Sequence, residues 1–373
     1  MKIKDNLFRF RPWNMGYYRV MHGFKTALAC VLGLILARYN DWSTGQWIPI
    51  TVMVVMGAQI HFGGAVHKAL MRMLGTLSGV AITILVLSLF GNSYLVILLA
   101  VFFSVILFSY IASGPGDISY VGTLGGVTVI LILSGQSVNI AEAMHRGFCI
   151  TMGVIIALLI SRIVFPFHAR DRLYYRMVTT LRNLNKLYLI SIKLQLEDAG
   201  YHKLGTRIAK HIAEQPRLLH EAEIGSFFMA AKKQLFADII ASEQTLNKLI
   251  DLSYVARKEQ GAQELVEKYQ MYLSPIQAVI ANNLSYLAEC VQHYGQSYGQ
   301  PDVIVFNRID DSLLQIDLIA ETLGSGHAGQ QIILQSSFLF VMKQLLKELE
   351  KSRNLIAKVD GKALDSVVQF SGI

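Results

Sequence analysis

The sequence is poor in charge and in cysteine. Of its 373 residues, 16% are charged and 53% are hydrophobic, and the mean hydropathy is +0.41. This balance excludes a disordered chain and is not that of a soluble globular domain. The three cysteines form no CxxC pair, so we expect neither a disulfide framework nor a zinc site.

Motifs of enzyme chemistry are also missing. The sequence has no P-loop and no HExxH, and the histidines of its second half are scattered. Residues 324–329 match GxGxxG, but residues 311–321 before them have the pattern of an amphipathic helix rather than a strand. The motif therefore predicts an interhelical loop, not a nucleotide site. We expect no enzyme activity, no cofactor and no bound metal.

Acidic residues are scarce in the first half of the chain. Residues 1–169 hold 11 Lys or Arg and 4 Asp or Glu, whereas residues 170–373 hold 23 and 22. The net charge of +8 thus resides almost wholly in the hydrophobic half. A basic excess placed there indicates membrane topology signals and attraction of anions, and we expect no nucleic-acid partner.

Long apolar runs predict an all-α membrane protein with six transmembrane helices. The short turns 91–93 and 113–119 carry the glycine and proline expected of tight reversals. We expect a cytoplasmic flank at 1–19, a six-span domain at 20–166 and a cytosolic helical domain at 167–373. The predicted spans are approximately 20–37, 42 or 47 to 60, 73–90, 94–112, 120–133 and 148–164.

Basic residues fix the expected orientation. With six spans, the N-terminal flank, the segment holding Lys68 and Arg72, and the exit at 162–176 all lie on one side. The positive-inside rule then places both termini in the cytoplasm. The first apolar run is longer than the hydrophobic part of a removable signal peptide, so we expect no cleavage there.

Small residues recur at spacings that let helices pack closely. Gly75 and Gly79 share one helical face, as do Gly122 and Gly126. Gly153 follows Arg146 at the offset by which Gly79 follows Arg72, which suggests two inverted repeats of three spans, a common transporter plan. Because the match is short, chance is the alternative explanation.

Cations in or beside the spans favour an anionic substrate. An ionisable residue at membrane depth is a functional candidate, and arginine can grip a carboxylate with two parallel hydrogen bonds. We interpret Lys68 and Arg162 as topology anchors in contact with membrane lipid, and snorkelling to the headgroups is the simpler explanation for Lys25. The predicted substrate-binding residues are Arg72, Arg146, Lys25, Thr76 and Gln59.

The second half of the chain alternates charged and apolar residues at helical spacing. Leu235, Ile239 and Leu246 follow the pattern of one buried face. Expected breaks near Gly200, Pro216, Pro275, 295–301 and 324–329 predict six or seven helices packed as a bundle. The apolar stretch 332–342 is too short to span a bilayer, so it is either a buried or a membrane-facing helix of this bundle.

Three segments resemble the family of fusaric acid resistance proteins and aromatic acid exporters, to which plant aluminium-activated malate transporters are related. They are Trp47-Ile-Pro49, the Arg-x-x-Gly-Thr-x-x-Gly core within 68–79, and 146–153 with Phe165-Pro166. The resemblance implies an inner-membrane exporter of aromatic or other small organic carboxylates, or a related anion channel. Larger bacterial members of the family look like two such units in one chain, which implies a homodimer here.

Two functions of different classes remain open from the sequence. One is an organic-anion permease, including a passive channel, because no acid lies deep in a span to couple protons. The other is a non-transporting membrane scaffold whose bundle binds a cytosolic partner. Glycine-rich span interiors and charges at their ends favour the permease, since an anchor needs neither.

Overall fold

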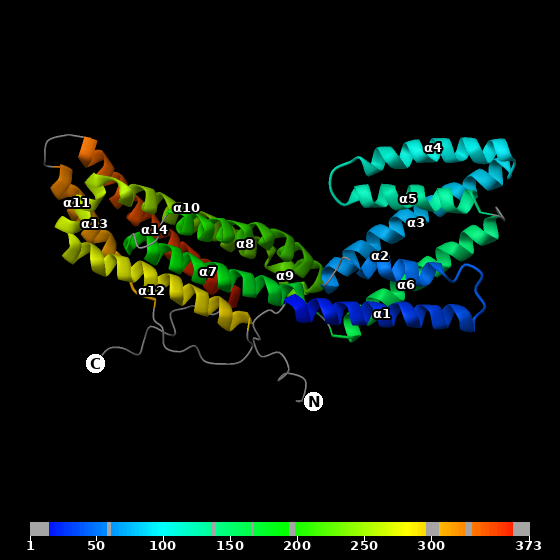
Figure 1. Ribbon diagram of the computed structural model, residues 1–373, viewed down its shortest axis with the longest axis horizontal. Helices are drawn as coiled ribbons and strands as arrows, with labels where there is room; N and C mark the ends of the chain where they lie inside the picture. The colour runs from blue at the N-terminus through cyan, green and yellow to red at the C-terminus, as the bar shows by residue number, and fades with distance from the viewer. Residues whose placement is uncertain are drawn as a thin grey trace, which may run out of the picture. The chain divides into compact units, whose positions relative to one another are not determined.

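A computed structural model describes residues 15–57, 61–135, 139–165, 167–193, 198–295, 306–324 and 330–360. Within these ranges the regular secondary structure is helical, without a strand, which confirms the all-α expectation (Figure 1). The chain divides into two compact units between Ala169 and Arg170. Each unit is described separately.

The first unit contains the apolar helices. Four of them, α1, α3, α4 and α6, are long and apolar enough to cross a membrane, whereas α2 and α5 are shorter. Ten residues of α2 rise only about 15 Å, half of a hydrocarbon core of roughly 30 Å. The bounds are α1 (Met15–Tyr39), α2 (Trp47–Met56), α3 (Phe62–Phe90), α4 (Tyr94–Ala112), α5 (Ile118–Leu133) and α6 (Ile140–Ile163).

Two helices begin earlier than predicted. Helix α3 starts at Phe62 rather than at 73, and α6 starts at Ile140 rather than at 148. The prediction placed each start where charged residues stop, but a helix begins where its backbone is capped. Asn139 caps α6 by accepting a 2.7 Å hydrogen bond from the Glu142 N–H. Arg72 and Arg146 therefore lie within helices, not at their mouths.

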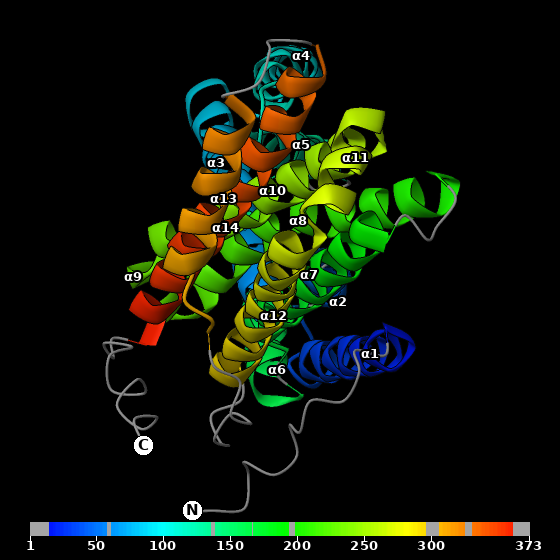
Figure 2. The same cartoon turned by 90° about the vertical axis from the view of Figure 1, so that its left-hand side faces the viewer.

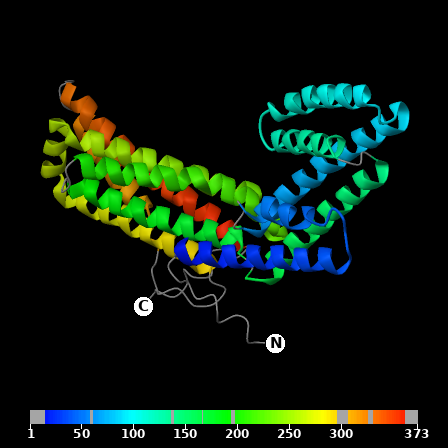
Figure 3. The ribbon, with the colours of Figure 1, turned by 45° about the vertical axis from the view of Figure 1, so that its right-hand side comes forward.

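Helices of the first unit pack in two groups. Helix α3 packs against α5, which α4 covers, while α6 packs against α2, which α1 covers, and α3 also packs on α6 (Figures 1 and 3). Helix α4 fully buries only Ser104 and Phe108, while Ile97, Ala100, Val101 and Ile111 are partly buried against the same core. One buried core joins α1, α2, α3 and α6; its members are Ala29, Val52, Val55, Met56, Ala69, Val154 and Ala157.

The second unit is a helical bundle whose long helices run side by side (Figure 2). It has eight described helices instead of six or seven, because short α9 and α11 separate longer ones. The stretch 332–342 lies in α14, with Phe338, Leu339 and Met342 buried. The helices are α7 (Ala169–Lys193), α8 (Asp198–Gly225), α9 (Phe227–Ala231), α10 (Lys233–Lys258), α11 (Gln260–Lys268), α12 (Gln270–Gly295), α13 (Asp310–Gly324) and α14 (Gln330–Asp360).

Two of the predicted breaks in this bundle are wrong, because Pro216 lies inside α8 and Pro275 lies inside α12. The break expected near Gly200 is confirmed approximately, since α7 ends at Lys193 and α8 begins at Asp198. Proline removes one backbone hydrogen bond, but the buried neighbours Gln215 and Leu218 hold the helix on both sides of Pro216. Tertiary packing thus overrides the local preference. Residues 325–329 of the glycine motif lie outside the described residues, and α13 precedes them as expected.

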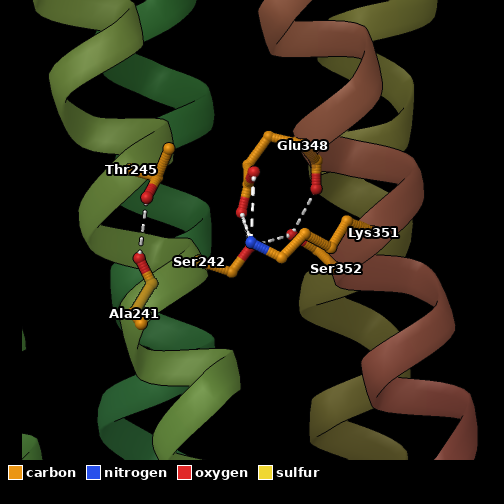
Figure 4. Close-up of polar contacts among 6 residues, drawn as sticks. All are labelled: Ala241, Ser242, Thr245, Glu348, Lys351 and Ser352. Atoms are coloured by element: carbon orange, nitrogen blue, oxygen red, sulfur yellow. Dashed lines mark hydrogen bonds and ion pairs between the residues drawn. The ribbon is translucent and has the colours of Figure 1, made fainter.

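Polar side chains connect α10 with α14. Ser242 Oγ donates a 2.6 Å hydrogen bond to Glu348 Oε1 and lies 2.6 Å from Ser352 Oγ (Figure 4). Lys351 Nζ lies 3.1 Å from the same Glu348 oxygen. The neighbouring Glu243 is buried, which raises its pKa to about 8 although Gln215 donates a 2.6 Å hydrogen bond to it. Glu243 is therefore mainly protonated at neutral pH.

Candidate functional site

Arg72 is enclosed by protein inside α3. Its side chain is 3% exposed, and its Nε has no hydrogen-bond partner among the residues that the structure describes. Ten residues of helix, about 15 Å, precede it. The Tyr120 phenol of α5 is close to the guanidinium. The carboxylate of Asp117 lies instead 2.8 Å from His67 Nε2.

A second buried donor stands beside Arg72. Thr76, one helical turn further on the same face, is also buried, and its Oγ has no hydrogen-bond partner within the described ranges. One turn before Arg72, the Lys68 ammonium lies 5.1 Å from the centroid of the Tyr120 ring. A buried cation without a counterion is destabilising, so an anion that binds here would relieve the cost.

Arg146 is buried but partly paired. It is 8% exposed, and its Nη2 lies 3.9 Å from Glu142 Oε1 on the preceding turn of α6. The guanidinium carbon lies 5.1 Å from the centroid of the Trp47 ring. Its Nε and Nη1 have no hydrogen-bond partner in the described part of the chain. Unlike Arg72, Arg146 thus has a carboxylate beside it.

Lys25 does not snorkel to the surface. Its side chain is 0% exposed, and its Nζ lies 4.7 Å from the centroid of the Phe167 ring. This ammonium has no hydrogen-bond partner among the described residues. His22, one turn before it, faces the backbone of Met56 and Gly57.

The structure separates the two arginines along the helices. Helices α3 and α6 run antiparallel, because Gly147 lies opposite Val80 while Arg162 stacks on Phe62 at 5.6 Å. Arg146 therefore lies opposite residue 81, nine residues and roughly 14 Å along α3 from Arg72. Arg72 and Thr76 form one candidate site and Arg146 another. Predicted Gln59 lies outside the described residues.

Glycines allow the closest helix approaches around these sites. A Cβ on Gly79 would lie 2.8 Å from the Gly125 carbonyl oxygen, and one on Gly153 would lie 2.8 Å from that of Ile48. A Cβ on Gly75 would lie 2.7 Å from the Val121 carbonyl oxygen. Helix α3 thus packs on α5, and α6 on α2, nearly backbone to backbone.

Gly122 and Gly126 face the other neighbour of α5. A Cβ on Gly122 would lie 2.7 Å from the Phe108 carbonyl oxygen of α4, and one on Gly126 would lie 3.2 Å from the Phe108 Cβ. These are contacts within one chain. The sequence left open whether such glycine faces pack within one chain or between two copies. The glycine faces of α5 therefore hold it between α3 and α4.

Several residues around the cations were missed by the sequence analysis. Glu142 was placed in a turn, although its spacing of four residues from Arg146 on one helix could have identified the pair. Tyr120 and Phe167 gave no such signal, because their contacts join helices distant in sequence. Trp47 was recognised only as part of the Trp47-Ile-Pro49 motif, not as a neighbour of Arg146.

Comparison with known proteins supports the resemblance drawn from the motifs. Residues 19–296 match the model of the Fusaric acid resistance protein family. The chain is also similar to Inner membrane protein YeeA of Escherichia coli (strain K12), with 27% identity over 188 residues. That similarity covers 50% of this chain and 53% of YeeA, so the chain matches about half the length of this curated relative.

Proposed function

Since the chain belongs to the fusaric acid resistance protein family, a family of membrane transporters, we propose that it is an inner-membrane permease that exports small organic anions such as aromatic carboxylates. The observation that carries this proposal is Arg72. It is a buried cation inside an apolar helix, next to the equally buried Thr76, and both offer donors without hydrogen-bond partners in the described residues. A carboxylate supplies the missing charge and acceptors.

Flux measurements test the permease against the scaffold alternative. Proteoliposomes loaded with labelled benzoate or a dicarboxylate should release the anion faster than protein-free liposomes. A proton gradient separates coupled export from a passive channel, because only coupled export responds to the gradient at a fixed membrane potential. If no anion leaves faster than from protein-free liposomes, the permease proposal fails and the scaffold remains.

Two inverted three-helix repeats are supported by matching contacts. A Cβ on Gly79 would meet Thr128 Cβ at 2.9 Å, and one on Gly153 would meet Thr51 Cβ at 2.7 Å. The offset between these threonines is 77 and that between these glycines is 74. The offset of 77 recurs in two further pairs, together with an offset of 75 from α1 to α4. In the first, Gly45 approaches Ala37 as Gly122 approaches Ala112. In the second, Gly33 faces Ile48 as Phe108 faces Gly125.

This relation accounts for the two short helices. Helices α2 and α5 end at Met56 and Leu133, which are equivalent under the offset of 77. Each repeat is then a long, a short and a long helix, with α1, α2 and α3 equivalent to α4, α5 and α6. We infer that the short helices complete their crossing with the turns that flank them, which gives six spans and inverts the second repeat.

A topology experiment tests the six spans. Reporters after Met1, at 113–117 and after Arg170 are expected to report the cytoplasm, and reporters near Asn40, Asn92 and Asn139 the opposite side. The reason is the excess of basic residues on one side. An external signal after Arg170 would require an odd number of spans and exclude both the inverted repeat and a cytosolic bundle.

We also propose that two copies form a C2 homodimer, the commonest symmetry of oligomers. The bundle half is nearly neutral, with 23 basic and 22 acidic residues, so net charge does not keep two copies apart. Native mass measurement in mild detergent should give twice the chain mass of 41.6 kDa. A monomer that still transports at high dilution in liposomes would contradict a dimeric pathway.

A further inference from the structure

The two arginine sites occupy equivalent positions but have opposite neighbours. The offset of 74 residues that relates Gly79 to Gly153 also relates Arg72 to Arg146. It relates Lys68 to Glu142, each one turn before its arginine. The backbone relation is thus repeated, while the charge beside the arginine is reversed.

This reversal means that an anion is attracted by the neighbour of Arg72 and repelled by the neighbour of Arg146. Lys68 adds positive charge one turn from Arg72. Asp117, at the start of α5, lies 2.8 Å from His67 rather than against Arg72. Arg146 has Glu142 Oε1 at 3.9 Å and the Trp47 ring at 5.1 Å. Among the other groups near Arg146, the His145 Nδ1 is engaged 2.8 Å from Thr44 Oγ. Glu142 is therefore the carboxylate that competes at Arg146.

We propose that Glu142 is an internal carboxylate that competes with the transported anion for Arg146 and makes this arginine the weaker, releasing site of the pathway. This inference rests on the proposed permease function. Arg72, with Lys68, captures the organic carboxylate more tightly. An anion that reaches Arg146 meets the repulsion of Glu142 and is displaced from the guanidinium. The 25% exposure of the Glu142 side chain leaves room for it to move aside.

Glu142 also stands at a structural position, which decides the choice of variant. Its backbone N–H donates to the Asn139 side chain at the start of α6, three residues away. Every substitution at residue 142 except proline keeps this N–H. Glu142→Gln therefore removes the charge and keeps both the helix start and nearly the whole side-chain volume, whereas Glu142→Ala would also leave space beside Arg146.

Trp47 supplies a local reporter of anion binding. The chain has three tryptophans, and Trp47 contacts Arg146 directly. Malate, which does not absorb where tryptophan is excited, is titrated into the purified full-length protein carrying Trp13→Phe and Trp42→Phe. Adding Glu142→Gln should lower the malate concentration at half of the change in Trp47 emission about tenfold. Adding both Glu142→Gln and Arg146→Ala should abolish this gain, because the guanidinium that would bind malate more tightly is then missing.

The outcomes distinguish this inference from the permease proposal. If Glu142→Gln leaves the malate titration unchanged, or tightens it equally without Arg146, the competition is overturned. If Glu142→Gln tightens the titration as expected but the wild-type protein transports neither benzoate nor malate, the two-site chemistry stands and the permease function falls. An Arg72→Ala control should leave the Trp47 gain intact, because Arg72 lies at another level of the helices.

Discussion

Replacing Arg72 with alanine is expected to abolish anion flux while the protein remains folded and inserted in the membrane. The guanidinium is 3% exposed, and the residues described around it supply no carboxylate that pairs with it. An anion on the pathway is therefore the partner that Arg72 lacks. Loss of one member of a buried charge pair weakens binding by about 2 to 5 kcal/mol, which corresponds to roughly thirtyfold or more.

Arginine geometry adds a second expectation at this position. Arg72→Lys should restore only part of the flux, since an ammonium is a point charge and cannot form two parallel hydrogen bonds with a carboxylate. Flux of labelled benzoate from proteoliposomes with equal protein content measures both variants. Size-exclusion profiles in mild detergent show that each variant is folded.

Two other cations provide controls for Arg72→Ala. Arg162 is exposed at the end of α6 and stacks on Phe62, so Arg162→Ala should transport almost normally. Lys25→Ala should have an effect smaller than that of Arg72→Ala. Normal flux in both Arg72→Ala and Arg146→Ala would show that these residues are anchors and would move the site elsewhere.

Gly79→Leu is expected to prevent α3 from packing on α5. A Cβ at this position would already lie 2.8 Å from the Gly125 carbonyl oxygen and 2.9 Å from Thr128 Cβ, so backbone would have to move. Overpacking a core by a few methylenes costs about 1 to 3 kcal/mol, and more where backbone is the obstacle. The melting temperature in mild detergent should therefore fall, since a cost of about 1.4 kcal/mol already lowers the ratio of folded to unfolded protein about tenfold.

Gly147 offers a matched control in α6. A Cβ there would lie 3.6 Å from a Val80 methyl group, an ordinary contact. Gly147→Ala should therefore melt close to wild type, whereas Gly79→Ala and Gly153→Ala should melt at lower temperatures. Equal melting of the three alanine variants would show that the backbone approaches at Gly79 and Gly153 do not hold the helices together.

Helix identity in the membrane half could be predicted well, because apolar runs and glycine turns are local signals. Helix α4 has the predicted bounds, and the ends of α3 at Phe90 and of α5 at Leu133 agree. The starts of α3 and α6 could not be predicted from hydropathy. Charged residues such as Lys68 continue a helix once neighbouring helices bury its backbone and side chains, so polarity misplaced the beginning of α3 by about three turns.

The candidate site was only partly accessible from the sequence. Arg72 stands out in a sequence with few charges at membrane depth, and Thr76 follows it on the same helical face. The sequence could not show which cation has a carboxylate beside it. That depends on contacts between helices and, for Arg146, on the start of α6, which was misplaced. Glu142 belonged to a predicted turn until α6 was found to begin at Ile140, and only then did it face Arg146.

The early end of α2 has an electrostatic consequence for Lys25. A helix carries about half a negative charge at its C-terminal end, where the last carbonyl groups have no partners. His22 faces this end at Met56 and Gly57, and Lys25 lies beside His22. The dipole of α2 thus gives Lys25 a permanent partial counterion made of backbone, while Arg72 lies far from either end of α3. The described residues supply no carboxylate to either cation, so of these two only Arg72 depends on a visiting anion for its compensating charge.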